Sequence, residues 1–356
     1  MLKSRRLRLK CNYLFLIAFL LLPLIFKISV CSATLPFKEP SEDELINESD
    51  LVLIGRVESQ HSVWNDQKTH IFTYTTISVE KVIKGAVSGY DIQVKSEGGQ
   101  VGEIGEASEF QVVFTLGEKV QLYLQRVDDK LYIVTHKCFG KISLEAGFEG
   151  FEENRLGYTF SGYTWSSSAF PLPYYISQDG TADTTEEFVK VQEGVNLWSA
   201  VANCPAEYKG TTSKGFGYDG ANIHIWVTDL PDNYGGEAYV WFTGSRIVEG
   251  DIRYNDNYNW SDTQKIVGLT AHEWGHVLGL DHSTLSTATM YPSINLLAAA
   301  TLSDDDISAI QALYGESTGG STTTIPTLGD IGIIICLLAL SCLIIFKKPN
   351  YRFSGK

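Results

Sequence analysis

Basic residues are scarce in this sequence. It has 28 Lys and Arg against 42 Asp and Glu in 356 residues, which gives a formal net charge of −14 at pH 7. A nucleic-acid-binding protein needs a basic face for the phosphates, so this balance argues against that class. Charged residues make up 20% and apolar residues 44% of the chain, a globular composition at a length that allows two domains with their own cores.

Cysteine is also rare. Of the six cysteines, four lie in two apolar segments near the ends of the chain, and only Cys138 and Cys204 lie between those segments. The central part can therefore hold at most one internal disulfide.

Charged residues are missing from one long run near each end. The first run follows five Lys and Arg and leads to the small residues Ser32 and Ala33. This order predicts a secretory signal peptide over residues 1–33, cleaved near Ala33. The alternative for the same segment is an uncleaved membrane anchor.

The second uncharged run covers Ile331 to Phe346 and is closed by two lysines. It predicts a transmembrane helix over 329–346, preceded by a Gly/Ser/Thr linker (317–328) and followed by a basic cytoplasmic tail (347–356). The stretch "IPTLGDIG" with this helix and tail resembles the C-terminal sorting signals of some Gram-negative bacterial surface proteins. We therefore expect an exported, membrane-anchored protein whose central part faces the periplasm or the cell surface.

Residues 49–146 contain neither an acid/base pair nor a metal-ligand spacing. Short runs rich in Val, Ile, Tyr and Thr follow one another without a strong helix signal. This pattern favours a small antiparallel β-barrel, which we place at 34–150. The segment resembles the OB-like domains, similar in outline to tissue inhibitors of metalloproteinases, that precede some bacterial metallopeptidases. That resemblance implies a binding or shielding module, with possible shielding of the active site.

Histidine occurs seven times, yet three fall within "TAHEWGHVLGLDHS". The segment "SDTQKIVGLTAHEWGHVLG" predicts a helix with Ser261 or Asp262 as its cap. On a helix, His272 and His276 lie on one face and can direct both imidazoles at one metal ion. Glu273 projects beside the metal, where it suits a general base for a metal-bound water.

A third ligand requires the helix to end. Gly279 can adopt a positive φ without a Cβ clash, so the chain can turn there and bring His282 back to the metal. Three protein ligands leave a fourth position open for water, which is the arrangement of a catalytic zinc.

"HEWGHVLGLDHS" matches the HExxHxxGxxH pattern of the metzincins, and Ser283 after the third histidine is the matrixin form. "ATMYPS" resembles the Met-turn, with Met290 as an apolar floor beneath the ligands, and "LSDDDISAIQALYG" resembles the C-terminal matrixin helix. The resemblance implies an α+β matrixin-like metallopeptidase domain over 156–316, with a twisted mixed sheet and long helices. It also implies one catalytic zinc, protein or peptide substrates, and a substrate edge strand at "GEAYVW" with Ala238.

Three features depart from the matrixin pattern. Arg253 stands where a structural-zinc histidine is expected, and Asn255 and Asn257 stand where carboxylates would bind calcium. We therefore expect neither extra metal, although Asp251 and Asp256 could still support a weak calcium site. The matrixin prodomain motif with its zinc-blocking cysteine is also absent.

Two questions stay open at this stage. In an oxidising space Cys138 and Cys204 are expected to form a disulfide between the two domains, but Cys138 could instead reach the zinc as a thiolate. The function expected is a membrane-anchored zinc endopeptidase with Glu273 as the base. The alternative is a surface binding protein that acts mainly through its barrel, with the protease accessory or latent.

Overall fold

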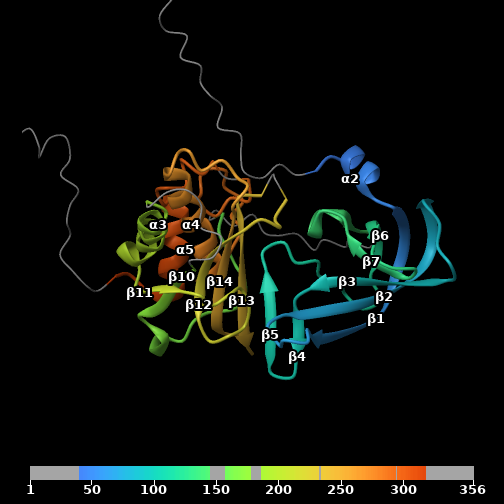
Figure 1. Ribbon diagram of the computed structural model, residues 1–356, viewed down its shortest axis with the longest axis horizontal. Coiled ribbons are helices and arrows are strands. Elements are labelled where there is room, and N and C mark those ends of the chain that lie inside the picture. Colours follow the sequence, from blue (N-terminus) through green and yellow to red (C-terminus); the bar gives the residue numbers. More distant parts are fainter. Residues whose placement is uncertain (1–39, 145–156, 178–185, 232–233, 294, 318–356) are drawn as a thin grey trace, which may run out of the picture.

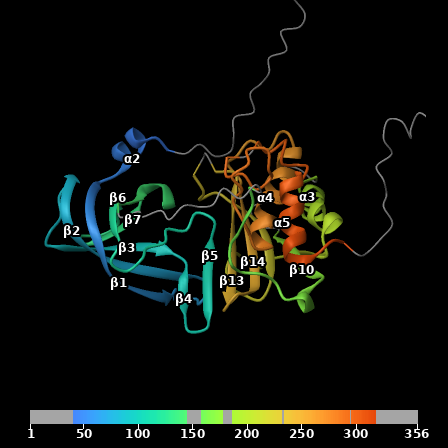
Figure 2. The ribbon, with the colours of Figure 1, turned by 180° about the vertical axis from the view of Figure 1, so that it is seen from behind.

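The structure, a computed structural model, describes residues 40–144, 157–177, 186–231, 234–293 and 295–317. These residues form a β-barrel and an α+β part that lie side by side (Figures 1 and 2). The expected signal peptide, transmembrane helix and basic tail lie outside the described residues, as does the linker beyond residue 317. Among the residues described, no helix has the length and apolar character needed to cross a bilayer.

Five strands close the N-terminal barrel. They are β1 (Leu51–Trp64), β2 (Ile71–Lys84), β3 (Asp91–Glu97), β6 (Lys119–Arg126) and β7 (Leu131–Val134). Strands β1, β2 and β3 pair in antiparallel order, β3 pairs with β7, β7 with β6, and β6 returns to β1. Helix α2 (Glu42–Glu48) precedes the barrel, and η2 (Lys137–Gly140) and β8 (Lys141–Ser143) follow it.

The predicted barrel is therefore present, but it is not purely antiparallel. The β3–β7 pair is parallel, because the chain between these strands makes a long excursion before it returns in the same direction. Successive side chains of its strands point alternately into the barrel and outward. In β3, for example, Ile92 and Val94 are buried, whereas Gln93 between them is exposed.

A hairpin leaves the barrel within that excursion. Its strands are β4 (Gly99–Val101) and β5 (Ile104–Ser108), and β5 pairs in antiparallel register with β13 (Gly236–Thr243) of the second part. Figure 1 shows β5 alongside β13 at the boundary between the two parts. The barrel thus contributes two strands to the sheet of its neighbour.

The second part contains the predicted mixed sheet. Its own strands run in the order β11 (Ala206–Thr212), β10 (Leu172–Ser177), β12 (Asn222–Val227), β14 (Arg246–Asn255), β13. All these pairings are parallel except β13–β14. The remaining elements are β9 (Thr159–Phe160), η3 (Ser167–Ala169), α3 (Glu187–Val201), α4 (Gln264–Val277), β15 (Leu280–Asp281) and α5 (Asp304–Tyr314).

Helix α4 lies in the core of this part. Every residue from Ile266 to Val277 is buried, and the same apolar core takes in side chains from the sheet, α3 and α5. The helix starts slightly later than predicted: Thr263 is the residue before its first turn, and the Asp262 carboxylate accepts a hydrogen bond from the Gln264 amide at 3.1 Å. Side chains carried by so buried a helix are held firmly in place.

Candidate metal centre

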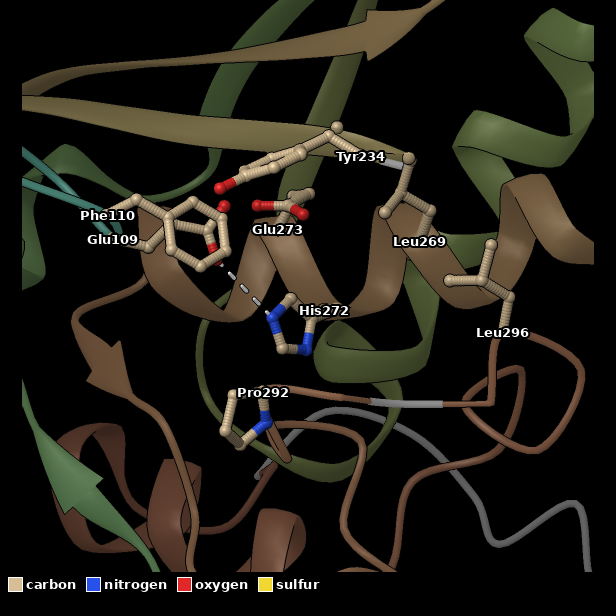
Figure 3. A pocket seen from close by; sticks show the side chains of 10 residues that line it. Glu109, Phe110, Tyr234, Leu269, His272, Glu273, Pro292 and Leu296 are labelled. Atoms are coloured by element: carbon tan, nitrogen blue, oxygen red, sulfur yellow. Dashed lines mark ion pairs between the residues drawn. The ribbon is translucent and has the colours of Figure 1, made fainter. Parts of the chain in front are cut away.

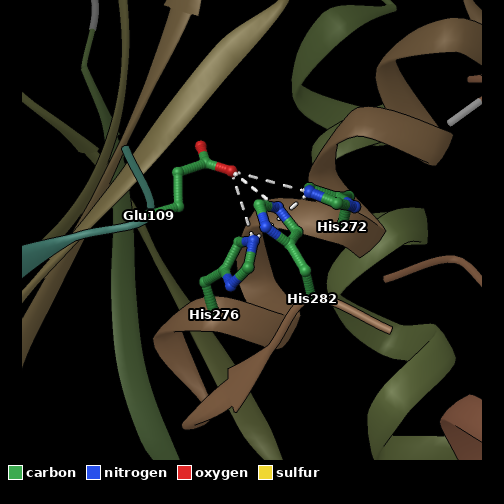
Figure 4. A group of neighbouring side chains, drawn as sticks. All are labelled: Glu109, His272, His276 and His282. Carbon is green, nitrogen blue, oxygen red and sulfur yellow. Dashed lines mark hydrogen bonds and ion pairs between the residues drawn. The ribbon is translucent and has the colours of Figure 1, made fainter. Parts of the chain in front are cut away.

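Two histidines of α4 present one ring nitrogen each to the same point. His272 and His276 are both buried, and their Nε2 atoms lie 3.2 Å apart (Figure 4). Their Nδ1 atoms lie 2.7 Å from the Thr289 carbonyl oxygen and 3.0 Å from the Leu280 carbonyl oxygen. A carbonyl can only accept, so each Nδ1 carries the proton and each Nε2 keeps its lone pair for a metal.

Gly279 ends this helix segment and directs the chain back. Its φ is +98°, and a Cβ built there would overlap the carbonyl oxygen of Tyr163. Its own carbonyl accepts a hydrogen bond from Ser161, and the two residues after it form β15, which pairs with β9. This turn brings the His282 ring to 4.8 Å from the His276 ring, between centroids, so the three histidines meet as the spacing predicted.

Met290 packs against the helix that carries His272 and His276. It is 1% exposed and packs against Gly275, where a Cβ would overlap its sulfur. The Asp306 carboxylate of α5 accepts hydrogen bonds from the Met290 and Thr289 amides at 3.0 and 2.7 Å. Asp306 therefore fixes both Met290 and the carbonyl that orients His272.

The fourth member of the cluster comes from the barrel. Glu109 follows β5 directly, and its Oε2 atom lies 3.6, 3.3 and 3.4 Å from the Nε2 atoms of His272, His276 and His282 (Figure 4). These four residues form a group whose ligand atoms all lie within 4.8 Å of one another. Glu109 was not among the predicted site residues, because it lies far from the histidines in the chain and belongs to no motif.

This arrangement fits a zinc ion. In a tetrahedral site with metal–ligand distances of 2.0–2.1 Å, neighbouring ligand atoms lie about 3.3–3.4 Å apart. The distance between the Nε2 atoms of His272 and His276 and the three distances from Glu109 Oε2 to the histidine nitrogens, 3.2–3.6 Å, lie close to that value. His282 Nε2 and both Glu109 oxygens are buried and accept no hydrogen bond. Buried polar atoms without partners are costly, and a cation at their centre satisfies all of them.

Glu273 lies beside the cluster and is not one of its ligands. The side chain is buried, and its carboxylate accepts a hydrogen bond from the Ala238 amide. Burial, and then the negative charge of Glu109, raise the pKa of the Glu273 carboxyl well above its usual value.

A narrow pocket opens next to Glu273. Its lining includes Phe110, Tyr234, Leu269 and Leu296, and the cavity that remains has a volume of about 20 Å³ (Figure 3). Phe110 is 5% exposed and its ring centroid lies 5.2 Å from that of Tyr234. Because Phe110 takes part of this space, what remains can hold about one water molecule.

The edge strand expected to bind substrate is not free. Residues Tyr239 to Thr243 of β13 pair with β5, and Ala238 lies one position beyond that pairing. The expectation of an open edge along "GEAYVW" is therefore wrong over this stretch, because a strand of the barrel takes the place of an added chain.

Side chains of the protein occupy the region of the two extra metals. Arg253 forms ion pairs with the buried Glu237 at 2.7 Å and with Asp229. The side-chain amide of Asn255 donates to the carbonyls of Pro231 and Tyr234 at 2.9 and 2.8 Å. Arg253 thus brings a positive charge to the place of a zinc ligand, while independence from calcium stays a prediction.

The predicted disulfide is wrong in this structure. Cys204 is buried in the core of the second part, where its thiol donates to the Trp198 carbonyl at 3.7 Å. Cys138 packs in a separate cluster with Phe110 and Tyr234, and neither cysteine forms a disulfide. Cys138 is also absent from the metal-ligand group, where Glu109 takes the place proposed for its thiolate.

The comparisons with known proteins agree with this geometry. Residues 164–315 match the family model described as Matrixin. The hatching enzyme of Paracentrotus lividus is 30% identical over 179 residues, which cover 48% of this chain and 29% of that protein. Matrix metalloproteinase-18 of Xenopus laevis is 39% identical over 101 residues, which cover 27% of this chain and 22% of that protein. Matrix metalloproteinase-C of Caenorhabditis elegans is 29% identical over 205 residues, which cover 51% of this chain and 32% of that protein.

The chain therefore spans about a third or less of the length of each of these relatives. The match covers the sheet from β10 to β14, the helices, and the three histidines with Glu273. Residues 164 to 315 are therefore similar to the matrixin domains of metalloproteinases.

Proposed function

We propose that the whole chain acts as a zinc endopeptidase, with His272, His276 and His282 as metal ligands and Glu273 as the general base. One observation carries this proposal: the Nε2 atoms of the three histidines lie close enough to one another to bind the same metal ion. In two of these histidines a backbone carbonyl accepts the Nδ1 proton and leaves the Nε2 lone pair for the metal. Zinc, when bound there, polarises the scissile carbonyl and acidifies the attacking water.

Glu273 performs the proton transfers in this proposal. The Ala238 amide donates a hydrogen bond to its carboxylate and so orients it beside the metal ligands. The carboxylate accepts the proton of the water as the carbonyl carbon is attacked, and then delivers it to the leaving amine.

Substitution of the base separates catalysis from metal binding. Glu273→Ala in the full chain should keep one zinc per chain and lower kcat against an unfolded protein substrate by about 10²–10⁴-fold. His276→Ala is the matched comparison, since it should lose zinc as well as activity. A Glu273→Ala protein with undiminished turnover would contradict the assignment of the base.

The place of action is proposed from sequence alone. Residues 1–33 support export, residues 329–346 support a membrane anchor, and "IPTLGDIG" supports a bacterial surface protein. The N-terminal barrel is proposed to be OB-like, which its strand order β1-β2-β3-β7-β6 supports: five strands closed by a β6–β1 pairing. We assign this barrel a role toward its own catalytic domain, because its β5 pairs with β13.

A further inference from the structure

We propose that the β4–β5 hairpin and the turn after it form a built-in inhibitor, in which Glu109 ligates the catalytic metal and Phe110 fills the adjoining pocket. This inference rests on the proposed peptidase function. It assigns to the barrel a specific task, which is to hold the protease inactive until the turn withdraws.

The position of the Glu109 carboxylate is that of a fourth ligand. Its side chain is only 1% exposed, and one oxygen faces the Nε2 atoms of all three histidines at nearly equal distances of 3.3–3.6 Å. Both oxygens are buried, and one of them shares a common point with the three Nε2 atoms, where a cation would offset the cost of burying a carboxylate. A catalytic zinc must keep this position for water and the substrate carbonyl, and a carboxylate in it excludes both.

The turn that carries Glu109 also fills the neighbouring pocket. The Gln111 amide donates to the Ser108 carbonyl at 3.2 Å, so Glu109 and Phe110 form the tip of a tight turn. Figure 3 shows Phe110 with Glu109 on one side of Glu273, below Tyr234. One residue of the tip thus blocks the metal and the next blocks the space beside the base.

Two polar contacts, one from the hairpin and one from η2, hold the barrel against the catalytic part. Glu106 of β5 is 2% exposed and accepts a hydrogen bond from the Trp241 indole at 3.1 Å. Lys137 forms an ion pair with Glu237, which is fully buried on β13. Desolvated charges tolerate few alternative partners, so these contacts fix one position of the barrel relative to the cleft.

The β5–β13 pairing adds a third obstacle. A substrate bound by strand addition needs unpaired backbone groups, and β5 uses those of β13 from Tyr239 to Thr243. The metal position, the pocket and the edge strand are therefore all taken by one continuous piece of the barrel, residues 104–110. Substrate and this segment cannot bind together.

The test removes the ligand without removing the barrel. Glu109→Ala in the full chain should raise kcat/KM against an unfolded protein by about 5–150-fold. This is the usual size of the effect that one binding event has on another, here binding of the hairpin tip and binding of substrate. Phe110→Ala should raise kcat/KM less, because the metal position stays blocked. The controls are Glu103→Ala, at the exposed turn of the same hairpin, and Val113→Ala, 64% exposed in the loop after it; both should leave activity unchanged.

A second readout does not depend on turnover. In the cobalt-substituted protein, titration with acetohydroxamate reports access to the metal through the visible spectrum. Glu109→Ala should change the starting spectrum and bind acetohydroxamate at least about 5-fold more tightly than the wild type. If it does so while peptide hydrolysis stays absent, the inhibitor is supported and the peptidase function fails. Identical spectra and identical acetohydroxamate affinity for wild type and Glu109→Ala would overturn the inference.

Discussion

Replacing Gly279 by alanine tests whether the turn after α4 builds the metal site. The backbone there has φ +98°, and left-handed backbone costs a residue with a Cβ about 1–2 kcal/mol. The new methyl would also overlap the Tyr163 carbonyl oxygen, and relieving such a contact in a packed region costs about 1–3 kcal/mol. We therefore expect Gly279→Ala to lower the free energy of unfolding by about 2–5 kcal/mol.

The matched control is Gly162→Ala. Gly162 has φ +88°, but no atom lies within 4 Å of a Cβ built there, so only the backbone cost of about 1–2 kcal/mol applies. Urea denaturation of both variants, with zinc and with chelator, gives the two free energies. Zinc should stabilise Gly279→Ala much less than Gly162→Ala, since the displaced turn carries His282. Equal losses in the two variants, with equal stabilisation by zinc, would refute the reasoning.

Three further outcomes are expected. Arg253→Ala should destabilise the fold by about 3–5 kcal/mol because it leaves Glu237 buried without that partner. Replacing the exposed Arg246 by alanine should change the unfolding free energy by no more than about 0.5 kcal/mol. Equal shifts of the melting temperature in the two variants would speak against a structural ion pair. Burial raises the pKa of Glu249 from 4.5 to about 7, so the folded state binds this proton more tightly than the unfolded state, and stability should fall as pH rises from about 4.5 to 7. In urea titrations at several pH values, the unfolding free energy of Glu249→Gln should not show this fall between pH 4.5 and 7. If wild type and variant change in parallel with pH, Glu249 is not the group responsible. Deleting residues 326–356 should release the protein from carbonate-washed membranes, and retention would place the anchor elsewhere.

The histidine site could be predicted from sequence because its geometry is local. His272 and His276 are related by one helical turn, and Gly279 marks a position where the chain can turn and return His282. The barrel could be predicted for a similar reason, since strand alternation is a nearest-neighbour pattern.

Glu109 could not be predicted in this way. It reaches the histidines only because β5 pairs with β13, and the pairing of strands so distant in the chain leaves no periodic trace in either segment. The parallel β3–β7 contact escaped prediction for the same reason.

The cysteine prediction failed on a different ground. Counting the residues left in an oxidising space identifies a possible pair but carries no information on where the two side chains lie. Cys204 lies in the core of the second part, whereas Cys138 packs in a separate cluster with Phe110, next to the metal centre. A pairing assigned by elimination needs a geometric criterion that the sequence does not contain.

X-ray absorption at the zinc edge of the full chain tests the central claim most directly. The account predicts one zinc per chain with four nitrogen or oxygen ligands at about 2.0–2.1 Å, and a changed oxygen contribution in Glu109→Ala. A sulfur ligand at about 2.3 Å, which would indicate Cys138 at the metal, or a chain that binds no zinc, would contradict it.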